Sequence, residues 1–190
     1  ENINNIKNYK IEKSFVNNNF QGKHVLGTLI KENEIYISHL KKNEKCNNFY
    51  ISKGVISKEE IKFENFFKSD ECVDNLQAGR MVNFSFENEN GILLSIGGEP
   101  WDSPTLKSQK KNSIIGKVLF INESGQYKVF SIGHRTPQGL TYSQNNIIST
   151  EHGPDGGDEI NKIEFNKNYG WPLASYGRHY SKINKKNKTP

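Results

Sequence analysis

Short apolar runs rich in Phe, Tyr, Ile and Val recur along the chain, with turn residues between them. Runs of this length and composition are typical of β-strands and not of long helices. The pattern predicts three groups of strands. These are 24–30, 34–39, 48–52 and 61–66 in the first group, 79–85, 91–96, 116–121 and 127–131 in the second, and 139–143, 146–149 and 159–165 in the third.

The turns between these runs support the strand prediction. The sequences "ENENG" at 87–91 and "NESGQ" at 122–126 each separate two apolar runs and supply a residue that tolerates positive φ. Helical periodicity is weak throughout, and "SPTLKSQKKNSIIG" at 103–116 is the best candidate for one short helical turn.

Groups of about four strands at this spacing predict an all-β fold built from propeller blades. We expect residues 1–20 to form a polar N-terminal segment and residues 21–190 to form part of one propeller domain. Propellers have roughly four to eight blades, so three blades leave unpaired edges. We therefore expect the chain to be part of a longer or processed product, or to need a partner.

Composition and charge exclude several classes of function. The net charge is +5, but Lys is spread along the chain and mixed with Glu, so a nucleic-acid-binding face is not expected. No apolar run reaches 18 residues, so no membrane span is expected. Cys46 and Cys72 do not form a CxxC pair, and they fit equally well one disulfide in an exported protein or two free thiols.

Two stretches carry residues suited to chemistry. In "SIGHRTPQGLTYS", Arg135 lies between two strands, where its guanidinium can bind a carboxylate or pair with a local Glu. In "STEHGPDGGDEIN", glycines and Pro154 impose an irregular backbone beside four acidic residues. Carbonyl and carboxylate oxygens are the ligands that calcium prefers, although an acidic surface loop has the same composition.

The order and spacing of "GHRTPQGL", "STEHGPDGGDEIN" and "NYGWP" resemble the soluble quinoprotein glucose dehydrogenase and aldose sugar dehydrogenase family, also called glucose/sorbosone dehydrogenases. The resemblance is dense over 133–172 and weaker through "AGRMVNF", "GILLSIGG" and "IIGKVLFIN". It implies a six-bladed propeller, periplasmic or secreted, that binds pyrroloquinoline quinone (PQQ) and calcium and oxidises the C1 hydroxyl of sugars or related alcohols. Its electron acceptor is not implied.

The resemblance also implies roles for individual residues. Arg135, Thr136, His152 and Asp158 would lie against the quinone or the reaction centre, with Thr136 where glucose enzymes commonly have Asn. The carbonyls of Gly153 and Pro154 would bind the catalytic calcium. The Glu159 carboxylate and the Tyr169 carbonyl would serve a second, structural calcium site. The remaining cofactor contacts come from later blades, so the 190-residue chain alone is expected to be inactive.

The departures from the family pattern concern catalysis. In "CVDNLQAGRMVNF", Leu76 stands where the family has its catalytic His, and Leu cannot accept a proton. Either Asp74 or His152 supplies the base, or the chain is a non-catalytic exported propeller that binds calcium, a glycan or a protein. Asn75 replaces a neighbouring acid, and Gly98 stands where the family usually has Asp. Nothing marks His24, His39 or His179 as ligands, and we expect them on the surface.

Overall fold

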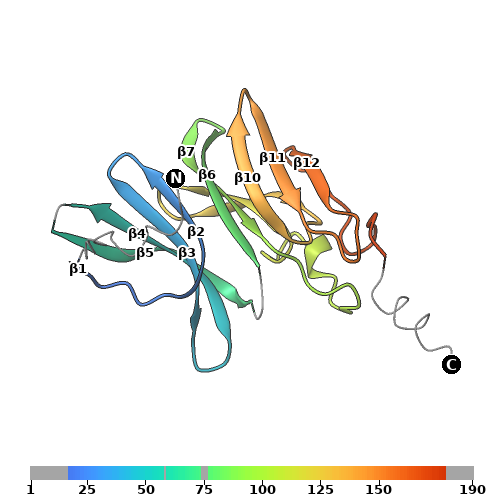
Figure 1. Ribbon diagram of the computed structural model, residues 1–190, viewed down its shortest axis with the longest axis horizontal. Helices are drawn as coiled ribbons and strands as arrows, with labels where there is room; N and C mark the ends of the chain where they lie inside the picture. The colour runs from blue at the N-terminus through green and yellow to red at the C-terminus, as the bar shows by residue number, and fades with distance from the viewer. Residues whose placement is uncertain (1–16, 58, 74–76, 179–190) are drawn as a thin grey trace, which may run out of the picture.

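The computed structural model describes residues 17–57, 59–73 and 77–178, and the regular secondary structure of this part of the chain is β-strand apart from one 3-10 turn (Figure 1). The strands and one 3-10 turn are β1 (Asn17–Asn18), β2 (Lys23–Lys31), β3 (Glu34–Lys42), β4 (Asn47–Ile56), β5 (Glu60–Cys72), β6 (Ala78–Phe86), β7 (Glu89–Ile96), η2 (Lys107–Gln109), β8 (Lys117–Asn122), β9 (Tyr127–Ile132), β10 (Pro137–Ser143), β11 (Asn146–Glu151) and β12 (Glu159–Ile163).

These strands form three sheets, each built from consecutive strands. The sheet orders are β1-β5-β4-β3-β2, β6-β7-β8-β9 and β10-β11-β12, and all pairs are antiparallel except β1 with β5. Each is one blade of a β-propeller, and the chain supplies about three blades. Every strand expected from the sequence is present, and the short helical turn is η2.

One edge strand of each sheet lies beside the neighbouring sheet, with β6 between β2 and β10 (Figure 1). Arg80 on β6 joins all three sheets, because its side chain donates to the carbonyl of Leu26 on β2 and to the carbonyl of Gln138 on β10, at 2.5 and 2.7 Å. The strands approach closely here, since a Cβ added at Gly27 would collide with the carbonyl oxygen of Gly79.

Two hydrophobic cores lie between the blades. The first packs Leu40, Phe49 and Ile51 of the first sheet against Leu94 and Leu119 of the second. The second packs the opposite face of the second sheet against the third; its buried residues are Leu93, Val118, Phe120, Phe130, Ile147 and Ile163. The second sheet is therefore covered on both faces, which explains its long apolar runs.

A disulfide joins Cys46, before β4, to Cys72 at the end of β5. The backbone N–H of Val73 donates to the carbonyl of Asn47 at 2.8 Å beside this link. The structure thus selects the disulfide from the two alternatives that the sequence left open.

The long connection from β7 to β8 is held by a buried lysine. The Lys117 ammonium donates to the carbonyls of Lys107, Ser108 and Ile115, at 2.6–2.9 Å. Glu99 accepts from the backbone N–H and hydroxyl of Ser108 in the same loop. No helix within 17–57, 59–73 and 77–178 is long and apolar enough to cross a membrane.

Candidate functional site

The two stretches singled out in the sequence meet at one end of the third sheet. Pro137 opens β10 and pairs with Glu151 at the end of β11, and Glu151 pairs in turn with Glu159 at the start of β12. Antiparallel pairing therefore places the 133–136 loop beside the 152–158 loop. The backbone N–H of His152 donates to the Thr136 carbonyl at 3.1 Å and joins the two loops.

Arg135 is fixed at several points in this loop pair. Its backbone N–H donates to Glu151 Oε2 at 3.2 Å, and its carbonyl accepts from the Gly98 N–H at 2.6 Å. Its Nη1 donates to the His152 carbonyl at 2.7 Å, and its guanidinium lies 5.1 Å from the centroid of the Trp171 ring. Its buried Nε has no hydrogen-bond partner among the described residues, so this nitrogen can still donate to a ligand.

The side chains of His152 and Asp158 are exposed to solvent beside Arg135. The imidazole Nδ1 of His152 lies 3.6 Å from Asp158 Oδ2, and the two side chains are 58% and 69% exposed. The other carboxylate oxygen of Asp158 accepts from the Gly153 N–H at 2.9 Å. Both side chains border an open groove of about 330 Å³, which a small ligand can enter.

The backbone between these residues has the irregular path that the sequence predicts. Gly156 and Gly157 have φ values of 74° and 70°. A Cβ at Gly153 would collide with the carbonyl oxygens of Gly156 and Gly157, so the loop closes tightly on itself. Within the described residues no hydrogen bond occupies the carbonyl oxygens of Gly153 and Pro154, which leaves both available to a cation.

Glu159 and Tyr169 also come together. They line a small cavity of about 10 Å³, with room for one occupant of about the size of a water molecule. Glu151, Arg135 and Gly153 lie on the same cavity. Within 17–57, 59–73 and 77–178, no group of three or more His, Cys, Asp or Glu is arranged to hold a metal. The ligands expected at the two calcium positions are therefore mainly backbone carbonyls, with few carboxylates.

Beneath Arg135 lies a buried polar network that the sequence did not reveal. His134 is fully buried; its Nδ1 lies 2.7 Å from Glu151 Oε1 and its Nε2 lies 2.7 Å from Ser131 Oγ. Burial raises the pKa of Glu151, but hydrogen bonds from His134, Asn161 and the Arg135 backbone outweigh burial and leave this pKa below its ordinary value. The carboxylate is thus charged inside the sheet. The only sequence signal for this buried network is Glu151, at the end of β11.

Trp171 and Gly98 form the support behind Arg135. The indole N–H of Trp171 donates to the Glu99 carbonyl at 2.8 Å, and the Gln109 side chain donates to the Trp171 carbonyl at 2.6 Å. A Cβ at Gly98 would lie 2.5 Å from the His134 carbonyl oxygen. The Asp expected at position 98 from the resemblance has no room on this backbone.

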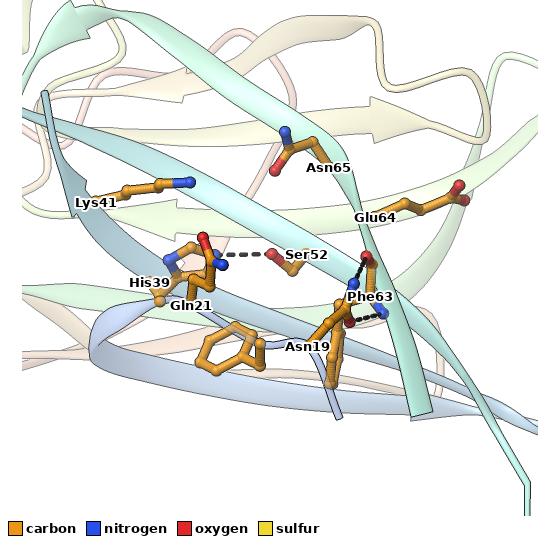
Figure 2. Close-up of a pocket in the computed structure, with 10 residues that line it drawn as sticks. Asn19, Gln21, His39, Lys41, Ser52, Phe63, Glu64 and Asn65 are labelled. Atoms are coloured by element: carbon orange, nitrogen blue, oxygen red, sulfur yellow. Dashed lines mark hydrogen bonds between the residues drawn. The ribbon is translucent and has the colours of Figure 1, made fainter. Parts of the chain in front are cut away.

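The expectation that His39 is a surface residue was wrong, whereas His24 is exposed and His179 lies outside the described residues. His39 is 2% exposed, and its Nε2 lies 2.9 Å from Ser52 Oγ (Figure 2). A crossing segment before β2 places the Phe20 ring against the His39 ring, with centroids 5.0 Å apart. These three residues line a pocket of about 260 Å³ on the first sheet, which lies on the opposite side of the molecule from the third sheet in Figure 1. Burial lowers the pKa of His39.

The position of the expected catalytic base is not among these residues. Leu76, Asp74 and Asn75 lie outside the described residues. The structure resumes at Gln77, whose carbonyl accepts from the Gly97 N–H at 2.9 Å, close to the Gly98–Arg135 contact.

Comparison with known proteins supports the family resemblance found in the sequence. The profile of the Glucose / Sorbosone dehydrogenase family matches residues 25–190. Aldose sugar dehydrogenase YliI of Escherichia coli K12 is 51% identical over 119 residues, covering 54% of this chain and 30% of that protein. Quinoprotein glucose dehydrogenase B of Acinetobacter calcoaceticus is 35% identical over 85 residues, covering 37% of this chain and 18% of that protein.

A crystal structure of a glucose dehydrogenase superposes on 85% of this chain with a TM-score of 0.71 and 28% identity. The match covers 52% of that structure. The chain thus spans about half of the solved relative, and the aligned segments cover less than a third of the two curated relatives.

Proposed function

The chain belongs to the glucose/sorbosone dehydrogenase family, and we propose that it is one half of a PQQ- and calcium-dependent sugar dehydrogenase. In this proposal the remaining blades close a ring around β2, β6 and β10 and supply the other cofactor contacts. The substrate class is an aldose or a related alcohol, as the names of the relatives suggest.

The observation that carries the proposal is the convergence of two loops at one end of the third sheet. Arg135 with its unpartnered Nε, the exposed His152 and Asp158, and the free carbonyls of Gly153 and Pro154 all lie there. A cationic fork, a pair of oxygen ligands and an open groove are what an anionic quinone and a calcium ion require.

Each residue has a definite task in this proposal. The Arg135 guanidinium would bind a carboxylate of the quinone, and the carbonyls of Gly153 and Pro154 would hold the catalytic calcium. When bound, the quinone would supply an electrophilic carbonyl that can accept hydride, and calcium would increase its electrophilicity. Glu159 and the Tyr169 carbonyl would bind the second calcium, and Thr136 would contribute through the backbone that joins the loops.

Removal of the sugar hydroxyl proton falls to His152. Leu76 cannot accept a proton, whereas the His152 imidazole is exposed and has Asp158 beside it to stabilise the charge it gains. Asp74 is the second candidate for this step.

The disulfide supports export to the periplasm or the medium. Disulfides persist in oxidising compartments and are rare in the cytosol, and Cys46 pairs with Cys72 here. The same compartment gives access to sugars outside the cell.

The test is a titration and assay of the full-length protein with PQQ and calcium, using aldoses and a dye acceptor. We expect calcium-dependent turnover, a loss of about tenfold or more in PQQ affinity for Arg135→Met, and a loss of about 100-fold in kcat for His152→Ala. Turnover that is unchanged in His152→Ala but lost in Asp74→Ala would assign the base to Asp74.

Leu76 supports one competing function, a non-catalytic exported propeller that binds calcium, a glycan or a protein. Quinone binding without turnover on any aldose would favour this alternative. Failure to bind PQQ at all would overturn the proposed function.

A further inference from the structure

We propose that His134 is a positioning residue that holds Arg135 in the orientation that binds the cofactor, through the buried carboxylate of Glu151. The proposal rests on the proposed function for the role of Arg135. The geometry that carries it does not depend on any bound group.

The chain of contacts is continuous and buried. Ser131 Oγ, the two ring nitrogens of His134 and Glu151 Oε1 are linked by two contacts of 2.7 Å. The three side chains are 1%, 0% and 6% exposed. No substrate can reach this arrangement, so the resemblance to a Ser-His-acid triad has no hydrolytic meaning here.

Both ring nitrogens of His134 have a partner inside the protein. A carboxylate only accepts hydrogen bonds, so Nδ1 donates to Glu151 Oε1. Nε2 pairs with the Ser131 hydroxyl, which can donate or accept.

Glu151 passes this restraint to Arg135. Its second oxygen accepts from the Arg135 backbone N–H at 3.2 Å, while its first also accepts from Asn161 at 3.2 Å. Because the next residue, His152, accepts from Arg135 Nη1, the backbone and the guanidinium of Arg135 are both tied to 151–152. Without the His134 bond, Glu151 loses its closest donor, and the anchor of Arg135 weakens.

His134 also stacks on the Tyr169 ring, with centroids 4.6 Å apart. Because of this contact, two variants of His134 can distinguish a positioning role from a packing role. His134→Asn keeps a donor near the Nδ1 position but loses the stack, whereas His134→Phe keeps the stack but loses the donor. Positioning predicts that Asn rescues and Phe does not; packing predicts the reverse.

The first measurement is amide hydrogen exchange on the 190-residue chain without cofactor. For His134→Phe we expect exchange of the Arg135 N–H to accelerate about tenfold or more, against less than about threefold for His134→Asn. The Leu94 N–H on β7 reports global opening, and its exchange should not accelerate in His134→Phe. Ser149→Ala is the matched control, because Ser149 is buried on the same strand as Glu151 and its hydroxyl has no partner among the described residues.

The second measurement is PQQ affinity of the full-length protein in a double-mutant cycle. His134→Phe should weaken binding about tenfold in the native background and less than about twofold in an Arg135→Met background, since both act through one contact. Additive losses, or Asn behaving worse than Phe, would overturn the proposal.

Glu151→Gln carries the same test if His134→Phe does not fold. It should reproduce the faster Arg135 exchange, and unchanged exchange would overturn the proposal. A full-length protein that binds no PQQ would refute the proposed function alone, because the exchange measurement still decides whether His134 holds Arg135.

Discussion

Lys117 acts as an internal cation at the residue scale. It is fully buried, and its ammonium binds three backbone carbonyls of the loop that ends at β8. That loop carries Glu99, whose carbonyl supports Trp171 beneath Arg135. One lysine therefore orders a loop that reaches the candidate site, in the way that a bound ion organises its carbonyl ligands.

Burial lowers the pKa of Lys117 from 10.5 to about 8, while Glu99 and Glu71 oppose the shift. Between about pH 8 and 10.5 the unfolded chain binds this proton and the folded chain does not, so the contribution of Lys117 to stability rises with pH. Urea unfolding at several pH values measures this effect. In this range the free energy of unfolding of the wild type should rise, relative to that of Lys117→Met, by up to about 1.4 kcal/mol per pH unit. Parallel stability curves would contradict the shifted pKa.

The disulfide matters most at the element scale, because it joins the residue before β4 to the end of β5 within the first blade. Cys46 is buried, and Asn43 accepts from its N–H at 2.8 Å. The link closes a loop of 26 residues at the point where the chain leaves the first sheet for β6.

Replacing both cysteines with Ser should lower the free energy of unfolding by about 3 kcal/mol, as expected for a loop of this length. Urea unfolding of the oxidised wild type, the reduced wild type and the double variant measures this directly. The reduced protein and the variant should agree within about 1 kcal/mol. A loss below about 1 kcal/mol would mean that the hydrogen bonds around Asn43 and Asn47 hold this end without the link.

The strands were predictable because local pattern decides them. Turn residues with positive φ, such as Glu87, Asn88 and Gly125, stand where the sequence placed the turns. The convergence of Arg135 with the 152–158 loop was expected only from the resemblance. The His134–Glu151 bond and the burial of His39 depend on strand register and on a crossing segment, which no local pattern encodes.

Arg80 acts at the scale of the whole molecule. Its Nη1 and Nε donate to carbonyls of the two flanking blades, and its own strand lies between those blades. The Ser38 hydroxyl adds a bond to the Gly79 carbonyl at 2.6 Å, close to the Gly27 backbone. The three blades thus share one polar junction in addition to their two apolar cores.

Arg80→Met should therefore cost about 2–4 kcal/mol, because it removes two charge-assisted hydrogen bonds and leaves carbonyls unpaired. Exchange of amides in β2, β6 and β10 should accelerate before exchange within the outer strands. The exposed Lys162→Met is the matched control, with an expected change of less than about 0.5 kcal/mol. Acceleration confined to β6–β9 would instead mean that Arg80 stabilises one sheet only.

Arg80 makes its contacts to carbonyl oxygens of the backbone and not to side chains. Leu26 and Gln138 can therefore change in evolution without breaking the junction, because every residue type carries the same carbonyl. The arginine itself has no such freedom. Related sequences should hold this position constant while its two partners drift, so divergence in the outer sheets need not change how the blades are joined.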